Sequence, residues 1–265
     1  MQTVLAMAGA TDMGRVRQRN EDSLAFDTKH GFAVLADGMG GYNAGDVASQ
    51  MAVALLLKGL NKHLNATDIA EQELQNIVCD EIAKANTAVY HAAVAQPDYA
   101  GMGTTLVLAV FRGQQMLSAH IGDSRLYRLR STQFEQLTID HSLFQEQLDC
   151  GVYSREELTL FHPKNLVTRA LGVEQEVAVD VGLHTTQLED IYLLCSDGLT
   201  DMASEDDIRD TIDLNRTNLK QAAKALVKLA NDHGGRDNIA VALIKIGKPS
   251  ARDKIINTIS KRLFA

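Results

Sequence analysis

The chain has 265 residues, 45% of them hydrophobic, which is enough for one large domain or two small ones with a real core. A formal net charge of -8 argues against a nucleic-acid phosphate backbone as the main partner, because such binders usually carry an excess of basic residues. The three cysteines lie far apart without a CxxC pair, so they suggest neither a disulfide framework nor a zinc site and favour a cytoplasmic location. No apolar run approaches the roughly 18 residues of a membrane span, and we expect a protein that is neither secreted nor membrane-embedded.

The first 40 residues are predicted to form strands separated by polar turns. Apolar, β-favouring composition indicates strands at 3–10, 23–27 and 31–37, and a basic turn at 11–20 follows the first of them. A glycine-rich turn after the third strand leads into helical sequence.

Two helices are predicted next. Residues 45–60 form the first, and residues 71–94 form a longer one that we expect to pack on a sheet. The residues that stand at helical spacing in the first helix are Val47, Met51, Ala54, Leu55 and Lys58. The apolar stripe of the second helix comprises Leu74, Ile77, Val78, Ile82, Ala85 and Val89.

The second half of the chain begins with short strands at hairpin-like spacing over 104–138, which predicts antiparallel sheet. Residues 140–172 loosen into short helical pieces, one of them capped by Ser154, and we interpret them as a surface flap. The elements expected after the flap are a strand at 190–198, helices at 205–212 and 219–235, and a strand at 239–246.

This order of elements predicts an α+β domain whose sheets are covered by helices on their outer faces. No linker is long enough to require a boundary, so residues 1–246 are expected to form one domain that includes the flap. The remaining segment, 247–265, is basic and places Ile255, Ile259 and Leu263 on one helical face. We expect it to lie on its own domain, with docking to a partner as the alternative.

Four aspartates stand at the ends of predicted strands. Asp37, Asp123 and Asp197 each follow an apolar run and adjoin a glycine, and Asp237 directly precedes the last strand. Hard divalent cations prefer oxygen ligands, and glycine allows the backbone to approach them closely. The sequence therefore predicts a carboxylate metal centre.

Such a centre would suit phosphoryl chemistry. Two divalent cations a few ångströms apart lower the pKa of a shared water and stabilise both oxygens of an in-line displacement at phosphorus. Asp37 is the candidate for the bridging carboxylate, with Asp197 and Asp237 on one ion and the Gly38 carbonyl on the other. Oxygen-only ligation favours Mg or Mn over zinc. Arg17 can supply a bidentate fork to a phosphate anion.

Eight motifs extend over nearly the whole chain. They are GRVRQRNEDS (14–23), VLADGMGG (34–41), GMGTTL (101–106), IGDSRLY (121–127), LTIDHS (137–142), HPKNLVTRALG (162–172), LLCSDGLTD (193–201) and GGRDNIAV (234–241). In this order they resemble the metal-dependent protein phosphatases of the protein phosphatase 2C type, in their compact bacterial form. The resemblance implies a sandwich of two antiparallel β-sheets flanked on both sides by helix pairs. It also implies hydrolysis of phosphoserine and phosphothreonine by a metal-bridging hydroxide, without a phosphoenzyme.

The resemblance also implies roles for single residues. Asp37 looks like the bridging ligand and Gly38 like the carbonyl ligand. Asp197 and Asp237 look like ligands of the first ion, and Arg17 looks like the phosphate-binding arginine. Two Mn or Mg ions are expected at these positions.

Three further acids match positions of the family. Glu21 and Asp22 match acids that act near the metals, largely through bound water. Asp123 together with Asp197 matches the weaker third metal site of bacterial members. Some eukaryotic members carry a histidine directly after the metal-site Asp-Gly and use it as general acid, whereas this chain has Met39. The proton donor for the leaving group therefore stays unassigned.

Four residues near these motifs receive structural interpretations. His141 is interpreted as a flap anchor rather than a general acid, and His120 as a structural residue. Cys195 is interpreted as a small core residue rather than a nucleophile. Asn238 follows the last ligand and is expected to orient it.

Two alternatives compete with a phosphatase. One is a catalytically inactive, phosphatase-like regulatory or phosphoprotein-binding module, but every expected metal-ligating acid is present. The other is a two-metal phosphodiesterase, which would need positive charge for a nucleotide. The expected partners are phosphorylated proteins, by fold-level analogy a Ser/Thr kinase or its targets. The sequence leaves open the physiological substrate and the choice between Mn and Mg.

Overall fold

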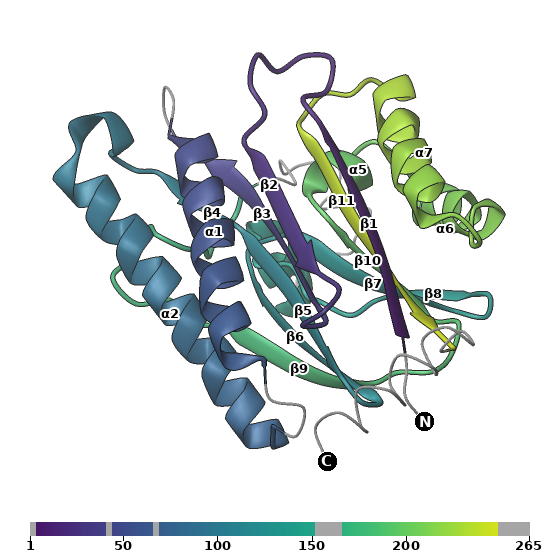
Figure 1. The fold of residues 1–265 in the computed structure, drawn as a ribbon. Helices are drawn as coiled ribbons and strands as arrows, with labels where there is room; N and C mark the ends of the chain where they lie inside the picture. Colours follow the sequence, from purple (N-terminus) through teal and green to yellow (C-terminus); the bar gives the residue numbers. More distant parts are fainter. Residues whose placement is uncertain (1–3, 41–43, 66–68, 152–165, 249–265) are drawn as a thin grey trace.

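Two antiparallel β-sheets lie face to face, and helices cover the outer face of each (Figure 1). The computed structural model describes residues 4–40, 44–65, 69–151 and 166–248. Three apolar clusters fill the spaces between the four layers: one beneath each group of helices and one between the sheets. The predicted α+β sandwich with flanking helix pairs is confirmed.

The first sheet has the strand order β2-β3-β5-β6-β9. Its strands are Asp22–Asp27 (β2), Phe32–Met39 (β3), Leu106–Arg112 (β5), Gln115–Ile121 (β6) and Asp180–Thr185 (β9), and the short Gly103–Thr104 (β4) pairs with β3. Helices Gly45–His63 (α1) and Glu71–Ala95 (α2) cover it, and a 3-10 turn, Pro97–Tyr99 (η1), follows them. Because side chains alternate along a strand, Phe32 and Val34 of β3 face these helices while Ala33 and Leu35 face the other sheet.

The second sheet has the strand order β1-β11-β10-β7-β8. Its strands are Val4–Asp12 (β1), Ile239–Gly247 (β11), Ile191–Cys195 (β10), Arg125–Arg130 (β7) and Gln133–Gln136 (β8). The helices on its outer face are Asp197–Thr200 (α5), Glu205–Leu214 (α6) and Leu219–Asp232 (α7). The predicted strand at 190–198 is thus shorter than expected, because the chain turns into α5 at Asp197.

The residues noted at helical spacing in the first helix do not make up the buried face of α1. Ala54, Leu55 and Lys58 are exposed, whereas smaller residues such as Ala48 and Ala52 are fully buried. α1 lies in the same apolar cluster as both its sheet and α2, and short alanine side chains allow its backbone to lie close to them. The stripe predicted for α2 is confirmed: its members are buried, except Ile77, which is half-buried.

The segment 140–172, which we predict to be a surface flap, begins with a short helix and ends in the core. Ser142 caps the short helix Leu143–Asp149 (α3), since its Oγ accepts the Gln145 N–H at 3.2 Å. Leu171 is fully buried and belongs to the core beneath α1 and α2, so the last flap residues are not surface residues. The predicted cap Ser154 lies outside the described residues.

Strand β9 was not predicted from the sequence. Its burial pattern is only weakly alternating, and Gly182 interrupts its side-chain pattern. A Cβ at Gly182 would lie 2.8 Å from His184 Nε2 and 2.9 Å from Ser118 Oγ, which explains the glycine.

None of the helices in the described part of the chain is long and apolar enough to cross a membrane. The basic segment 247–265 lies outside the described residues from position 249 on.

Candidate metal centre

Asp37 stands near the end of β3, and two threonines fix its backbone. Its N–H donates to Thr105 Oγ1 at 2.9 Å, and its carbonyl accepts from the Thr105 N–H and the Thr104 hydroxyl, both at 2.8 Å. Burial, followed by the nearby Asp22 and Asp197 carboxylates, raises the pKa of Asp37 well above its usual range. The carboxylate is therefore held in place among other acids.

Asp22 lies beside Asp37 on the neighbouring strand β2, in direct register with it. Its side chain is 7% exposed, and Oδ2 accepts a hydrogen bond from the Ser196 hydroxyl at 2.7 Å. Oδ1 is buried and has no hydrogen-bond donor among the described residues. Burial raises the pKa of Asp22 to about 7, although the Ser196 hydrogen bond opposes this shift.

Three further aspartates come from turns at strand ends. Asp197 begins α5 after β10, Asp237 precedes β11, and Asp123 follows β6. Burial and the neighbouring Asp123 raise the pKa of Asp197 well above its usual range, and burial and Asp140 raise that of Asp123 to about 6. The sandwich thus brings carboxylates from both sheets to one place.

Gly38 and Glu21 adjoin the first residue of α1. The Gly38 N–H donates to the Glu21 carbonyl at 3.1 Å. A Cβ at Gly38 would lie 1.9 Å from the Gly45 carbonyl oxygen, so no other residue fits there. A Cβ at Gly45 would lie 2.7 Å from Glu21 Oε2, which places this carboxylate at the helix N-terminus, where negative charge is favoured.

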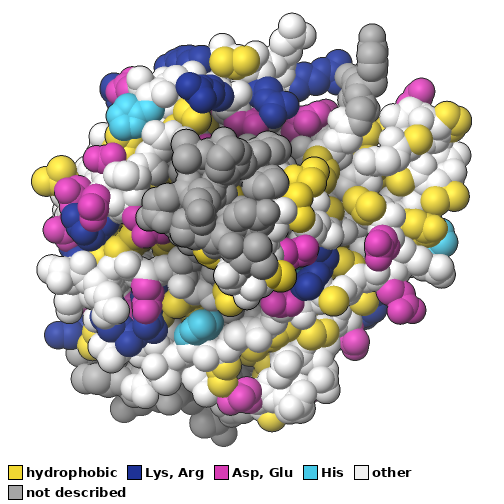
Figure 2. Space-filling model, turned by 180° about the vertical axis from the view of Figure 1, so that it is seen from behind, with side chains coloured by type: hydrophobic (Ala, Val, Ile, Leu, Met, Phe, Trp, Pro, Cys, Tyr) yellow, Lys and Arg dark blue, Asp and Glu magenta, His cyan; other side chains and the backbone are white. Residues whose placement is uncertain are grey.

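Arg17 belongs to the loop between β1 and β2. This loop lies at the upper edge of the molecule in Figure 1. The Arg17 side chain is 52% exposed, and Nη2 lies 2.7 Å from Asp237 Oδ2. Lys and Arg side chains gather along the same upper edge in Figure 2, with carboxylates between them. A guanidinium has five N–H donors, so donors other than the one to Asp237 are available for an anion.

Asn238 contacts Asp237 through its backbone, whereas its side chain has other partners. Its Oδ1 accepts the Glu21 N–H at 2.8 Å, and its Nδ2 donates to the Met13 and Arg19 carbonyls. Only its backbone N–H reaches the ligand, donating to Asp237 Oδ1 at 2.8 Å. The side chain therefore holds the loop that carries Arg17 instead of orienting Asp237.

A cleft of about 360 Å³ collects most of the predicted site residues. It is lined by Arg17, Glu21, Asp37, Gly38, Met39, Gly40, Thr105, Asp123, Leu166, Val167, Asp197, Asp237 and Asn238. Asp22 does not line it. A second hollow of about 340 Å³ shares Asp123 and Asp197 with the cleft and is also lined by Asp140 and Arg125, which form an ion pair at 2.6 Å.

The residues of the cleft fit hard divalent cations. The acidic side chains that line it offer carboxylate oxygens as ligands. The Oδ1 atom of Asp197, like that of Asp22, is buried and has no hydrogen-bond donor among the described residues. A buried carboxylate oxygen without a donor is costly unless a cation or hydrogen bond compensates it. Mg and Mn prefer such oxygen ligands.

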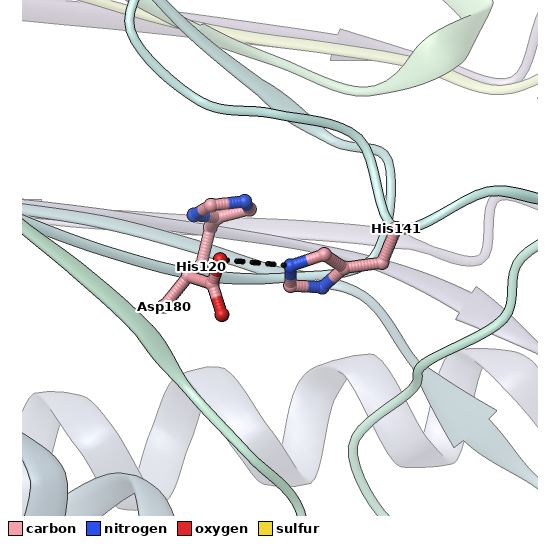
Figure 3. Close-up of side chains that lie close together, drawn as sticks. All are labelled: His120, His141 and Asp180. Atoms are coloured by element: carbon pink, nitrogen blue, oxygen red, sulfur yellow. Dashed lines mark ion pairs between the residues drawn. The ribbon is translucent and has the colours of Figure 1, made fainter. Parts of the chain in front are cut away.

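A second group with metal-ligand residue types lies apart from the cleft lining. His120, His141 and Asp180 bring their ligand atoms within 4.8 Å of one another (Figure 3). The Arg169 guanidinium already occupies this place, with Nη1 2.7 Å from Asp180 Oδ1 and 3.1 Å from His141 Nε2. This group therefore contains its own cation and is a poor metal site.

Sequence reasoning missed the hydroxyl groups that support the acids. Thr104, Thr105 and Ser196 lie within quoted motifs, but their partners are far away in sequence and only strand pairing shows them. The core interpretation of Cys195 agrees with the structure, since the residue is fully buried and burial raises its pKa to about 12. Met39 lines the cleft but has no proton to donate.

The chain is similar to known bacterial protein phosphatases over most of its length. The family model of protein phosphatase 2C matches residues 13–231. The serine/threonine phosphatase stp of Listeria welshimeri is 43% identical over 239 residues, which cover 89% of this chain and 93% of the relative. The protein phosphatase PhpP of Streptococcus pneumoniae is 35% identical over 245 residues, which cover 91% and 97%.

Solved structures agree with these relatives. The serine/threonine phosphatase PstP/Ppp of Mycobacterium tuberculosis superimposes with a TM-score of 0.84 at 35% identity, covering 92% of this chain and 100% of that one. The PstP catalytic domain in complex with two manganese ions has a TM-score of 0.81 at 34% identity, covering 93% and 100%. The fold is thus that of metal-dependent phosphatases.

The chain belongs to the protein phosphatase 2C family. The prediction of a metal-dependent serine/threonine protein phosphatase is confirmed at this level. The assignment of individual ligands stays a prediction.

Proposed function

We propose that the chain hydrolyses phosphoserine and phosphothreonine in proteins at a centre of two Mn or Mg ions in the cleft. The observation that carries the proposal is the convergence of Asp37, Asp197 and Asp237 from both sheets beside Arg17. An inactive, phosphoprotein-binding module would not need this set of acids, and their presence favours the enzyme.

The proposed ligands are the carboxylates of Asp37, Asp197 and Asp237 and the carbonyl of Gly38, with Asp123 and Asp197 at a weaker third position. Bound cations of this kind supply a water of lowered pKa and offset the negative charge of the phosphoryl group. Glu21 is proposed to act near these ions through water, as is Asp22.

Arg17 is proposed to bind and orient the phosphoryl group. Its ion pair with Asp237 places the guanidinium at the cleft, and its high exposure leaves it accessible to substrate. A guanidinium matches phosphate oxygens in bidentate geometry, which fixes the orientation of the group as well as its charge.

The proton for the leaving group is proposed to come from water in the cleft rather than from an imidazole. Met39 stands where some relatives have a histidine, and no histidine is among the described residues that line the cleft. His141 Nδ1 is already engaged with the Gly122 N–H.

The substrate is proposed to be a phosphorylated protein, such as a Ser/Thr kinase or one of its targets.

The cytoplasm is the proposed location, because all three cysteines are free thiols, as is usual in a reducing compartment. The one-domain arrangement of residues 1–246 and a separate basic segment, 247–265, also remain proposals.

Purified protein assayed on a phosphothreonine peptide, with Mn²⁺ and with excess chelator, tests the function. Turnover that needs the metal supports it. Binding of the phosphopeptide without turnover would instead favour the inactive module, and turnover of a phosphodiester would favour the phosphodiesterase.

A further inference from the structure

Gly122 forms the turn that presents Asp123 at the end of β6, and one residue satisfies both of its backbone groups. The His141 N–H donates to the Gly122 carbonyl at 2.9 Å, and the Gly122 N–H donates to His141 Nδ1 at 3.0 Å. Gly122 is buried at φ +97°, and a Cβ there would lie 2.7 Å from Thr105 Cγ2. A buried N–H of this kind needs an acceptor, and His141 supplies it.

This contact defines the tautomer of His141. A ring nitrogen that accepts an N–H carries no proton, so a neutral His141 must carry its proton on Nε2. Nε2 lies 3.4 Å from Asp180 Oδ2, and Figure 3 shows the ring edge directed at this carboxylate. Arg169 Nη1 donates to Asp180 Oδ1 at 2.7 Å and also lies 3.1 Å from His141 Nε2. A guanidinium has no acceptor, so the Nε2 proton has Asp180 rather than Arg169 as its partner.

Neighbouring groups hold the ring in this orientation. The His120 ring stacks on it at a centroid distance of 4.6 Å and donates its own Nε2–H to the Ile139 carbonyl at 2.8 Å. The His141 carbonyl accepts the Thr168 N–H at 2.9 Å, which ties the position to the strand-like residues before Arg169. Burial, His120 and Arg169 lower the pKa of His141, which favours the neutral ring.

We propose that His141 is a positioning residue for Asp123: its neutral ring acts as a fixed acceptor for Gly122, and Asp180 is the acceptor that faces Nε2 in the tautomer that this task requires. The inference rests on the proposed function, because it takes Asp123 to be a ligand of the weaker metal position. His141 is not among the described residues that line the cleft. Its effect on the reaction passes through the backbone of the turn.

Two substitutions separate this role from simple packing. In His141→Asn the side-chain oxygen is the same number of bonds from Cβ as Nδ1, so an acceptor for Gly122 is retained. In His141→Gln the amide reaches the place of Nε2, and the acceptor at the Nδ1 position is lost. The exposed His91→Gln on α2 is the matched control.

Calorimetric titration of the full chain with Mn²⁺ is the main readout. Loss of a residue that orients a metal ligand lowers affinity by about 10- to 100-fold. We expect His141→Gln to weaken the weakest Mn²⁺-binding step by about tenfold or more, and His141→Asn and His91→Gln by no more than about threefold. Equal weakening by the Asn and Gln variants, or none by either, would overturn the proposal.

The ¹⁵N NMR spectrum of the wild-type protein is an independent readout, and it decides the matter if His141→Gln does not fold. We expect a His141 ring that is unprotonated at Nδ1 and protonated at Nε2 at neutral pH. A ring protonated at Nδ1 would refute the inference. A wild-type protein that binds Mn²⁺ but fails to hydrolyse phosphopeptide would refute the proposed function alone.

Discussion

Replacement of Arg17 by alanine tests the phosphate-binding assignment. The variant loses a charge-assisted bidentate contact with the phosphoryl group, which costs about 2–4 kcal/mol, or about 30- to 1,000-fold in kcat/KM. The Arg17–Asp237 pair is half exposed, with side-chain exposures of 52% and 30%, and such a pair contributes only about 0–1 kcal/mol to stability. We therefore expect a large loss of activity with little change in melting temperature.

The assay is steady-state hydrolysis of a phosphothreonine peptide with saturating Mn²⁺, together with a thermal melt. Arg17→Lys keeps the charge but not the planar fork, and should fall between the wild type and Arg17→Ala. Arg209→Ala, which removes a surface arginine paired with Asp206 and Asp210 on α6, is the control for loss of an exposed ion pair. Activity of Arg17→Ala within twofold of the wild type would refute the assignment.

Three other predictions concern protonation and reactivity. Folding raises the pKa of Asp22 to about 7 and that of Asp123 to about 6, so their contribution to stability is present at low pH and is lost as the pH rises through these values. The metal-free protein should therefore melt at a lower temperature at pH 7.5 than at pH 5.5. The opposite order of melting temperatures would contradict this prediction. Burial raises the pKa of Cys195 to about 12, so this thiol should resist iodoacetamide in the native protein. Mass spectrometry that finds Cys195 alkylated as fast as the exposed Cys150 would refute the core interpretation. His141→Ala should lower turnover of phosphothreonine peptide and of p-nitrophenyl phosphate by similar factors, whereas a loss of about 100-fold confined to the peptide would identify His141 as the general acid.

The layered fold could be predicted because its main signals are local. The strand β3 was recognised from its short apolar run before a glycine-rich turn, and the helix α2 from its apolar stripe with a period of about 3.6 residues. The buried face of α1 could not be predicted in this way, because Ala48 and Ala52 lie against the sheet for reasons of size rather than of hydrophobicity. Strand β9 has little pattern of its own and depends on pairing with β6.

The residues of the candidate site that could be predicted are those that stand next to glycine at the ends of strands. This pattern placed Asp37, Asp123 and Asp197 in one group, and the structure brings them to one cleft. The hydrogen bond from Ser196 to Asp22 connects residues 174 positions apart, and no local pattern signals it. Such contacts follow from the pairing and packing of whole strands.

The central claim is that the carboxylate cleft is a metal-dependent phosphatase centre, and one measurement tests it most directly. Hydrolysis of a phosphothreonine peptide is followed for the wild type and for Asp37→Asn, each with Mn²⁺ and with excess chelator. We expect turnover only in the wild type with metal, because Asp37 is the proposed bridging ligand and its loss removes the link between the two ions. Full activity of the wild type in excess chelator, or of Asp37→Asn with Mn²⁺, would contradict the claim.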